Sequence, residues 1–246
     1  MESYILFGGI TLLLSILFSM GGAGAGVAII PIFNFMGLDF TLAKAIGLFG
    51  GASTTITSSV MNIKRKVVDY KFVFPIASMM LLFAPLGAYS SSFIDEEIVK
   101  FFFMLMLFYS ATMMMFGKKK AIFHFKSNGI LFVVGGIVGF LAGLLGVGGG
   151  NLLIPILAIL GFEPKKVAVA VSFVVPFSTL SSFFTYASYI DIDWILLGVV
   201  SISAIVGGYV GNYMMHFKLE QKDIKKLMAV LLYGLALKLL YHFIIN

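Results

Sequence analysis

Two glycine clusters, each followed by a short apolar segment with a proline, are the features of this sequence best suited to bind a ligand. The clusters cover residues 21–26 and 146–150, and the prolines are Pro31 and Pro155. Glycine interrupts a helix, and a helix that restarts after the break begins with unpaired N–H groups and a partial positive charge. Glycine also lets a ligand approach the backbone closely, so each cluster is typical of a site for a small anion.

Two runs of hydroxyl side chains, 53–59 and 178–182, follow the glycine clusters at matching distances. Hydroxyls are neutral donors that can replace the water around an anion. Packing between helices is the more frequent role of any single hydroxyl, but as groups beside the breaks we interpret the runs as part of an anion pathway. The candidate substrate-binding residues are Gly24, Gly26, Gly148, Gly149, Gly150, Asn151, Thr54, Thr55, Ser58, Ser178, Thr179 and Ser182. We expect Asn151 to cap the second short helix, where the first has Val27.

The composition places these residues in a membrane. Of 246 residues, 60% are hydrophobic and 11% are charged, whereas soluble domains contain about 25% charged residues. This excludes a soluble enzyme, a nucleic-acid-binding protein and a disordered chain. We therefore interpret the net charge of +6 as a record of membrane orientation.

The charged residues divide the chain into apolar stretches, which predict an all-α polytopic membrane protein. No basic residue precedes the first stretch, so we expect it to belong to the mature protein. Eight stretches are long enough to cross or nearly cross a bilayer, and the two that follow the glycine clusters cover about half of one. The stretches are 4–20, 27–38, 41–63, 72–94, 98–116, 128–145, 152–162, 167–190, 194–217 and 227–245.

The two halves of the chain resemble each other. An ungapped shift of 124 residues gives 20 identities in 122 pairs, and seven of these lie in the 17 positions 21–37. Thr55 and Thr179 form one identical pair, and Ser58 and Ser182 form another. We therefore predict two repeats, 1–122 and 125–246, within one integral membrane domain.

The distribution of charge predicts that the repeats are inverted. The basic loop 64–71 corresponds to the acidic loop 191–193, and the acidic loop 95–97 corresponds to the basic loop 218–226. Lys and Arg concentrate in cytoplasmic loops, so equivalent loops lie on opposite sides. Each repeat must then cross the membrane an odd number of times. Three transmembrane helices follow each glycine break and its half helix, so the long helix, break and half helix together must form a hairpin that returns to its starting side. Both termini are expected outside. We expect Lys44 to snorkel to the outer interface; attracting anions to an entrance is the alternative.

Other residues predict what the protein lacks. No Asp or Glu lies deep in a span, which disfavours a proton pump or a cation channel. We expect no catalytic residues, no metal site and no cofactor. The fourfold spacings of Gly135, Gly139 and Gly143, and of Gly207 and Gly211, predict close helix packing.

The second glycine cluster also carries a family resemblance. The stretch from Gly146 to Pro155, Gly-Val-Gly-Gly-Gly-Asn-Leu-Leu-Ile-Pro, resembles the signature of the TauE/SafE sulfite exporter family. The first copy departs from it, with Ala23 and Ala25 where glycine is common in the family. The turns 64–70 and 191–194 also resemble family loops, and the resemblance covers essentially the whole chain.

The resemblance implies secondary transport or export of a small sulfur-containing anion, such as sulfite, a sulfonate or sulfoacetate, across the cytoplasmic membrane. The implied partners are that anion and the lipid bilayer, and no nucleic acid. The resemblance does not specify a coupling ion. It leaves the oligomeric state open, and a homodimer is one possibility. The alternatives are a transporter of another small anion or metabolite, a non-transporting membrane scaffold and a membrane-embedded enzyme.

Overall fold

The computed structural model describes residues 2–116, 128–217 and 221–245, and within these ranges the chain is helical without strands. The described residues form ten α-helices and one short 3-10 helix. They are α1 (Glu2–Met20), α2 (Gly26–Phe35), α3 (Phe40–Lys64), α4 (Tyr70–Ser90), η1 (Ser91–Phe93), α5 (Glu96–Phe116), α6 (Asn128–Leu145), α7 (Gly150–Ile159), α8 (Pro164–Ala187), α9 (Trp194–Phe217) and α10 (Gln221–Ile245). The all-α polytopic architecture is confirmed. The expected basic loop 118–126 lies outside the described residues, as do residues 218–220 of the loop 218–226.

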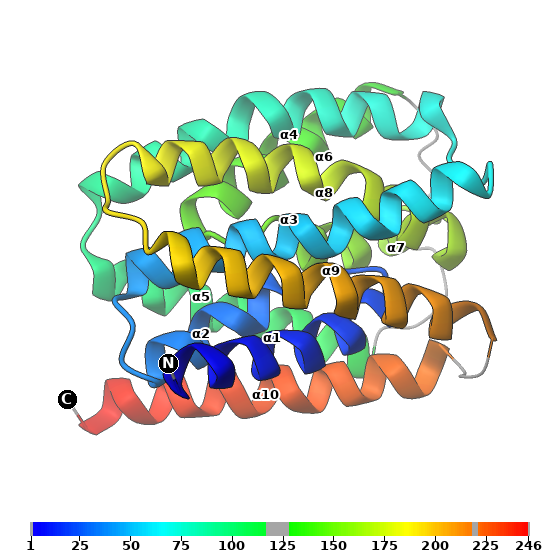
Figure 1. The fold of residues 1–246 in the computed structure, drawn as a ribbon. Coiled ribbons are helices and arrows are strands. Elements are labelled where there is room, and N and C mark those ends of the chain that lie inside the picture. Colours follow the sequence, from blue (N-terminus) through cyan, green and yellow to red (C-terminus); the bar gives the residue numbers. More distant parts are fainter. Residues whose placement is uncertain (1, 117–127, 218–220, 246) are drawn as a thin grey trace.

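The helices lie side by side along one axis, and the N- and C-terminal ends of the chain lie at the same end of the bundle (Figure 1). The chain reverses after α1, so that α2 runs back toward the end where α1 began. It reverses again after α6, and the α6/α7 hairpin opens toward the opposite end of the bundle (Figure 1). The expected pattern of long helix, glycine break and half helix is thus present twice.

The two halves of the chain interlock. Helix α1 packs on α9 of the other half, and α6 packs on α4. Helices α3 and α8, which carry the hydroxyl runs, pack against each other, and each also contacts the half helix of its own half. Helices α5 and α10 form a further pair. The hydroxyl-bearing helices therefore lie at the centre of the bundle.

Six helices in the described part of the chain are long and apolar enough to cross a membrane: α1, α4, α5, α8, α9 and α10. The expected spans 41–63 and 128–145 correspond to α3 and α6, which are not among these six helices. Helix α3 has 25 residues, enough for about 37 Å, but it carries hydroxyls and Lys44. Most of it is buried by neighbouring helices, so it does not need a lipid-compatible surface. Helix α6 is shorter, with 18 residues.

The spaced glycines allow helices to touch backbone to backbone, as predicted. A Cβ at Gly143 would collide with the carbonyl oxygen of Ala84, and one at Gly211 with that of Ile16. A Cβ at Gly139 would lie 2.8 Å from the Cα of Met80. These contacts join α6 to α4 and α9 to α1, so the packing interpretation of these glycines is confirmed.

We predict that Gly143→Ala destabilises the protein strongly, because its methyl group forces α6 away from α4. Gly234→Ala is the matched control: nothing lies within 4 Å of a Cβ at Gly234, and alanine favours the helix by about 1 kcal/mol over glycine. Thermal unfolding of the purified variants measures the effect. Equal melting temperatures for the two variants would contradict this account of the α4–α6 contact.

Candidate functional site

The two glycine breaks differ in backbone conformation. The second has three glycines at positive φ, at Gly146, Gly148 and Gly149, whereas the first has one, at Gly22. Ala25, which corresponds to Gly149, has a φ of −70°, and Gly149 has a φ of 75°. The first break therefore accepts alanine because its chain turns in a region that any residue adopts.

Asn151 does not cap α7, contrary to the sequence-based expectation. The helix begins at Gly150 with Gly149 as its N-cap residue, and no side chain caps it. The N–H groups of Leu152 and Leu153 both donate to the carbonyl oxygen of Gly149, at 3.1 and 2.9 Å. The helix thus starts two residues earlier than capping by Asn151 requires, with left-handed Gly149 as its N-cap residue. Asn151 lies inside the first turn and is buried.

Each break packs on the hydroxyl-bearing helix of its own half. A Cβ at Gly24 would lie 3.2 Å from the Cγ2 of Thr55, and one at Gly148 would collide with the Cγ2 of Thr179. Ser178 also donates to the carbonyl oxygen of Gly148, at 2.9 Å. The structure therefore brings the predicted glycines and hydroxyls together within each half.

Most of the predicted hydroxyls donate to carbonyl oxygens of their own helix. Thr55 donates to Gly51 at 2.8 Å, and Thr179 donates to Val175 at 2.9 Å. Thr54, Ser58 and Ser178 make similar intrahelical bonds. Two of them also reach α1, where Thr54 contacts Ser15 and Ser58 contacts Ser19. These hydroxyls contribute to packing in this conformation.

Asn151 and Ser182 are the exceptions within the predicted site. The Oδ1 atom of Asn151 and the Oγ atom of Ser182 are buried and have no hydrogen-bond partner among the described residues. Leaving such a group unsatisfied costs about 1–3 kcal/mol. These two side chains therefore have hydrogen-bonding capacity left for a ligand.

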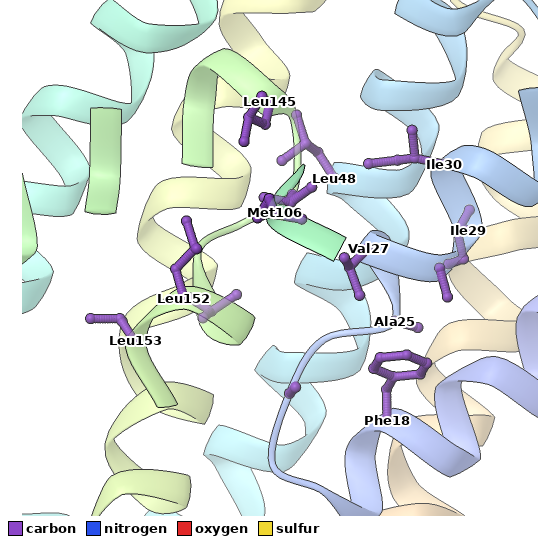
Figure 2. Close-up of a cluster of buried hydrophobic side chains, with 14 of the residues drawn as sticks. Phe18, Ala25, Val27, Ile29, Ile30, Leu48, Met106, Leu145, Leu152 and Leu153 are labelled. Atoms are coloured by element: carbon purple, nitrogen blue, oxygen red, sulfur yellow. The ribbon is translucent and has the colours of Figure 1, made fainter. Parts of the chain in front are cut away.

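The candidate site is closed in this conformation. All twelve predicted residues are buried. Val27, Leu48, Met106, Leu145 and Leu152 belong to one buried apolar cluster, which Figure 2 shows around the two breaks. An anion can reach the breaks only if these side chains move.

Lys44 lies inside the bundle rather than at the lipid interface, so the expectation that it snorkels is wrong. Its side chain is buried, and its Nζ atom donates to Oγ of Ser91 at 2.9 Å. The rings of Phe40 and Tyr186 lie beside the ammonium group. Lys44 also lines a cavity of about 340 Å³, together with residues of η1, of the start of α5 and of the segment after α8. These elements meet at the end of the bundle that carries the termini (Figure 1). The sequence contained a signal for this buried position, because Lys44 is one of the few lysines that lie inside an apolar stretch.

The opposite end of the bundle is joined by polar contacts between the halves. Lys166 at the start of α8 pairs with Asp69, the N-cap residue of α4, at 2.7 Å. Arg65 donates to Oδ1 of Asn212 at 3.0 Å. The hydrogen bond from Lys166 holds the pKa of Asp69 below its usual range. These contacts hold the start of α4 beside α8 and the end of α3 beside α9.

We predict that the Asp69–Lys166 pair stabilises the protein above about pH 4 and that its contribution is lost as the pH falls through the lowered pKa of Asp69. Asp69→Asn removes the charge and keeps a side chain that can cap α4. Because the pair is exposed, the loss at pH 7 is at most about 1 kcal/mol. Thermal unfolding of both proteins between pH 7 and pH 3 measures it. A difference that persists undiminished at pH 3 would contradict the assignment.

These features define a multi-pass membrane protein with two broken hairpins in its interior, an architecture of membrane transporters. The chain belongs to the sulfite exporter TauE/SafE family, whose model matches residues 7–239. No solved structure shows a significant match to it.

Two similar proteins are named as transporters. The probable membrane transporter protein YunE of Bacillus subtilis (strain 168) is 27% identical over 258 residues, which cover 91% of this chain and 92% of that protein. The probable membrane transporter protein MJ0441 of Methanocaldococcus jannaschii is 28% identical over 246 residues, covering 89% of this chain and 87% of that protein. Evidence of family and fold thus supports a membrane transporter.

Proposed function

We propose that this protein is a secondary transporter that carries a small sulfur-containing anion, such as sulfite or a sulfonate, across the cytoplasmic membrane. The observation that supports it best is the pair of glycine breaks deep in the bundle. Each break is followed by a half helix whose first N–H groups have no partner in the helix. Ser182 adds a buried hydroxyl that has no hydrogen-bond partner among the described residues and can donate to an anion. The family name points to sulfite as the first anion to test.

We further propose that the repeats 1–122 and 125–246 are inverted and work by alternating access. Two observations support this proposal. The hairpins open toward opposite ends of the bundle (Figure 1). The long helix of each hairpin packs on a helix of the other half, α1 on α9 and α6 on α4. A duplicated unit of this kind can rock against its counterpart around a fixed site. The buried site then corresponds to an intermediate closed to both sides.

Transporters of other small anions or of metabolites are the main alternative, because backbone N–H groups and hydroxyls do not require sulfur. A non-transporting scaffold would use the glycines for packing alone, as Gly143 does. An enzyme would need a catalytic group at the site, and the twelve candidate residues contain no carboxylate, imidazole or thiol.

Flux into proteoliposomes tests the proposed function directly. We expect saturable movement of labelled sulfite or of a sulfonate, competed by other members of that class more strongly than by carboxylates. Empty liposomes are the control for leak. Absence of saturable flux in both directions for every such anion would overturn the proposal.

Ser182→Ala is predicted to lower flux without lowering stability. The hydroxyl of Ser182 is buried and has no partner among the described residues, so its removal leaves no other polar group unsatisfied and the melting temperature should stay equal or rise. If the hydroxyl binds the anion, its loss should weaken apparent affinity by about tenfold, since a hydrogen bond to a charged group is worth about 1.5–3 kcal/mol.

Ser188→Ala is the matched control for this variant. Ser188 follows α8 and donates to the carbonyl oxygen of Thr185 in an exposed position, so its loss should leave flux unchanged. Equal affinities for Ser182→Ala and the wild type would remove Ser182 from the site.

A further inference from the structure

Lys44 is a buried cation that lacks a carboxylate partner. Only 2% of its surface is exposed, and among the residues that the structure describes no ion pair joins it to Asp or Glu. Its Nζ atom is 2.9 Å from the hydroxyl of Ser91 and 4.8 Å from the centre of the Tyr186 ring. A buried charge with neutral partners is costly, and an anion bound beside it would remove much of that cost.

The cavity beside Lys44 is large enough to admit a small oxyanion, and its lining is partly polar. Its volume is about 340 Å³, and the hydroxyl-bearing residues Thr41, Ser91, Ser92 and Tyr189 line it together with Lys44. Hydroxyls can donate to an anion while the ammonium supplies the opposite charge.

Two carboxylates, Asp39 and Glu96, also line this cavity, and each has its own partner. Asp39 accepts a hydrogen bond from the N–H of Leu42 and so caps α3. Glu96 pairs with Lys100 at 2.7 Å. Both carboxylates also act on Lys44 electrostatically at longer range, but among the described residues neither forms an ion pair with it. Lys44 is therefore available to pair with an incoming anion at close range, against the repulsion of Asp39.

Lys44 also connects this cavity to the second glycine break. The Cγ atom of Lys44 would be 2.7 Å from a Cβ at Gly146, where the break begins. The equivalent contact at the other break joins Gly22 to Ala168, which carries no charge. The charged side chain is therefore present at one end of the bundle and has no counterpart at the equivalent position of the other half.

We propose that Lys44 and Ser91 bind the transported anion at the outer end of its path, as a site separate from the central breaks. The assignment of the anion as sulfite or a sulfonate rests on the proposed function. The ammonium leaves its bond to the hydroxyl of Ser91, and both groups donate to oxygen atoms of the anion. The contact with Gly146 places this site next to the second hairpin, so that an anion can pass between the two.

A lipid phosphate has the same chemistry, and it is the competing occupant. Ile94 and Val99 line both the polar cavity and a neighbouring apolar groove of about 440 Å³ between α5, α6 and α7. A free anion is favoured because the ammonium group of Lys44 bonds to Ser91 in the polar cavity, and neither residue lines the apolar groove.

Half-saturation measured separately from each side of oriented proteoliposomes tests this site. Lys44→Met should raise the half-saturation concentration for sulfite on the outer side by about tenfold or more, because a charge-assisted hydrogen bond is lost. The half-saturation concentration on the cytoplasmic side should stay within about twofold, because an anion entering from that side does not meet Lys44 first. Lys238→Met is the matched control, because Lys238 is an exposed lysine placed over the Phe35 ring. It should leave both values unchanged.

Ser91→Ala provides a second variant that keeps the buried ammonium group. It should raise the outer half-saturation concentration at least twofold, and this result keeps the proposal testable if Lys44→Met fails to fold. Wild-type values on the outer side in either folded variant, with normal wild-type flux, would overturn the Lys44 site and leave the proposed function standing.

Calorimetry measures sulfite binding to the detergent-purified protein. It tells failure of the Lys44 site from failure of the proposed function. Binding that is weakened in Lys44→Met supports the site even if the wild type shows no flux, in which case the proposed function alone fails. Sulfite binding unaffected by Lys44→Met overturns the site. Binding of phosphatidylglycerol at Lys44 that sulfite does not displace makes the cavity a lipid site and also overturns the proposal.

Discussion

The constraint on which this structure depends is that a membrane interior offers no water to satisfy polar groups. Each glycine break opens the helical hydrogen-bond pattern inside the bundle, and the protein must supply partners for what it exposes. Ser178 donates to the carbonyl oxygen of Gly148, and the bonds of Leu152 and Leu153 to Gly149 restart the helix at once. Among the described residues, the oxygen atoms of Asn151 and Ser182 are left without partners. Together with the first N–H groups of the half helices, they are the polar groups of the site with capacity left for a ligand.

Close packing limits how the site can open. Glycines at helix contacts bring α4 against α6 and α1 against α9 so closely that no side chain fits between them. These pairs are suited to move as rigid units. At one end Asp69 pairs with Lys166 and Arg65 donates to Asn212. These polar contacts join side chains of the two halves and can exchange partners, whereas separation of the glycine-packed pairs would disrupt close backbone packing.

The sequence predicted the helices well because charge and glycine mark their ends. The breaks, the half helices and the packing glycines all follow from residue types whose local preferences are strong. Asn151 was misplaced because the start of α7 depends on the left-handed conformation of Gly149, which the sequence permits but does not require. Lys44 was misplaced because the direction of a long side chain depends on Ser91 and Tyr186, which are distant in sequence. The intrahelical bonds of the hydroxyls were likewise a packing outcome, since Thr and Ser bond to their own helix when no other partner is near.

Transport by alternating access, as we propose it, requires that the buried site open in turn to the two sides of the membrane and bind the anion. The chain has no cysteine, so a Ser182→Cys variant gives a single reporter within the site. A membrane-impermeant thiol reagent applied from each side in turn measures access to that position. We expect labelling from both sides, slowed by a saturating sulfonate. A thiol that reacts from neither side, or that reacts equally fast with the sulfonate present, would contradict it.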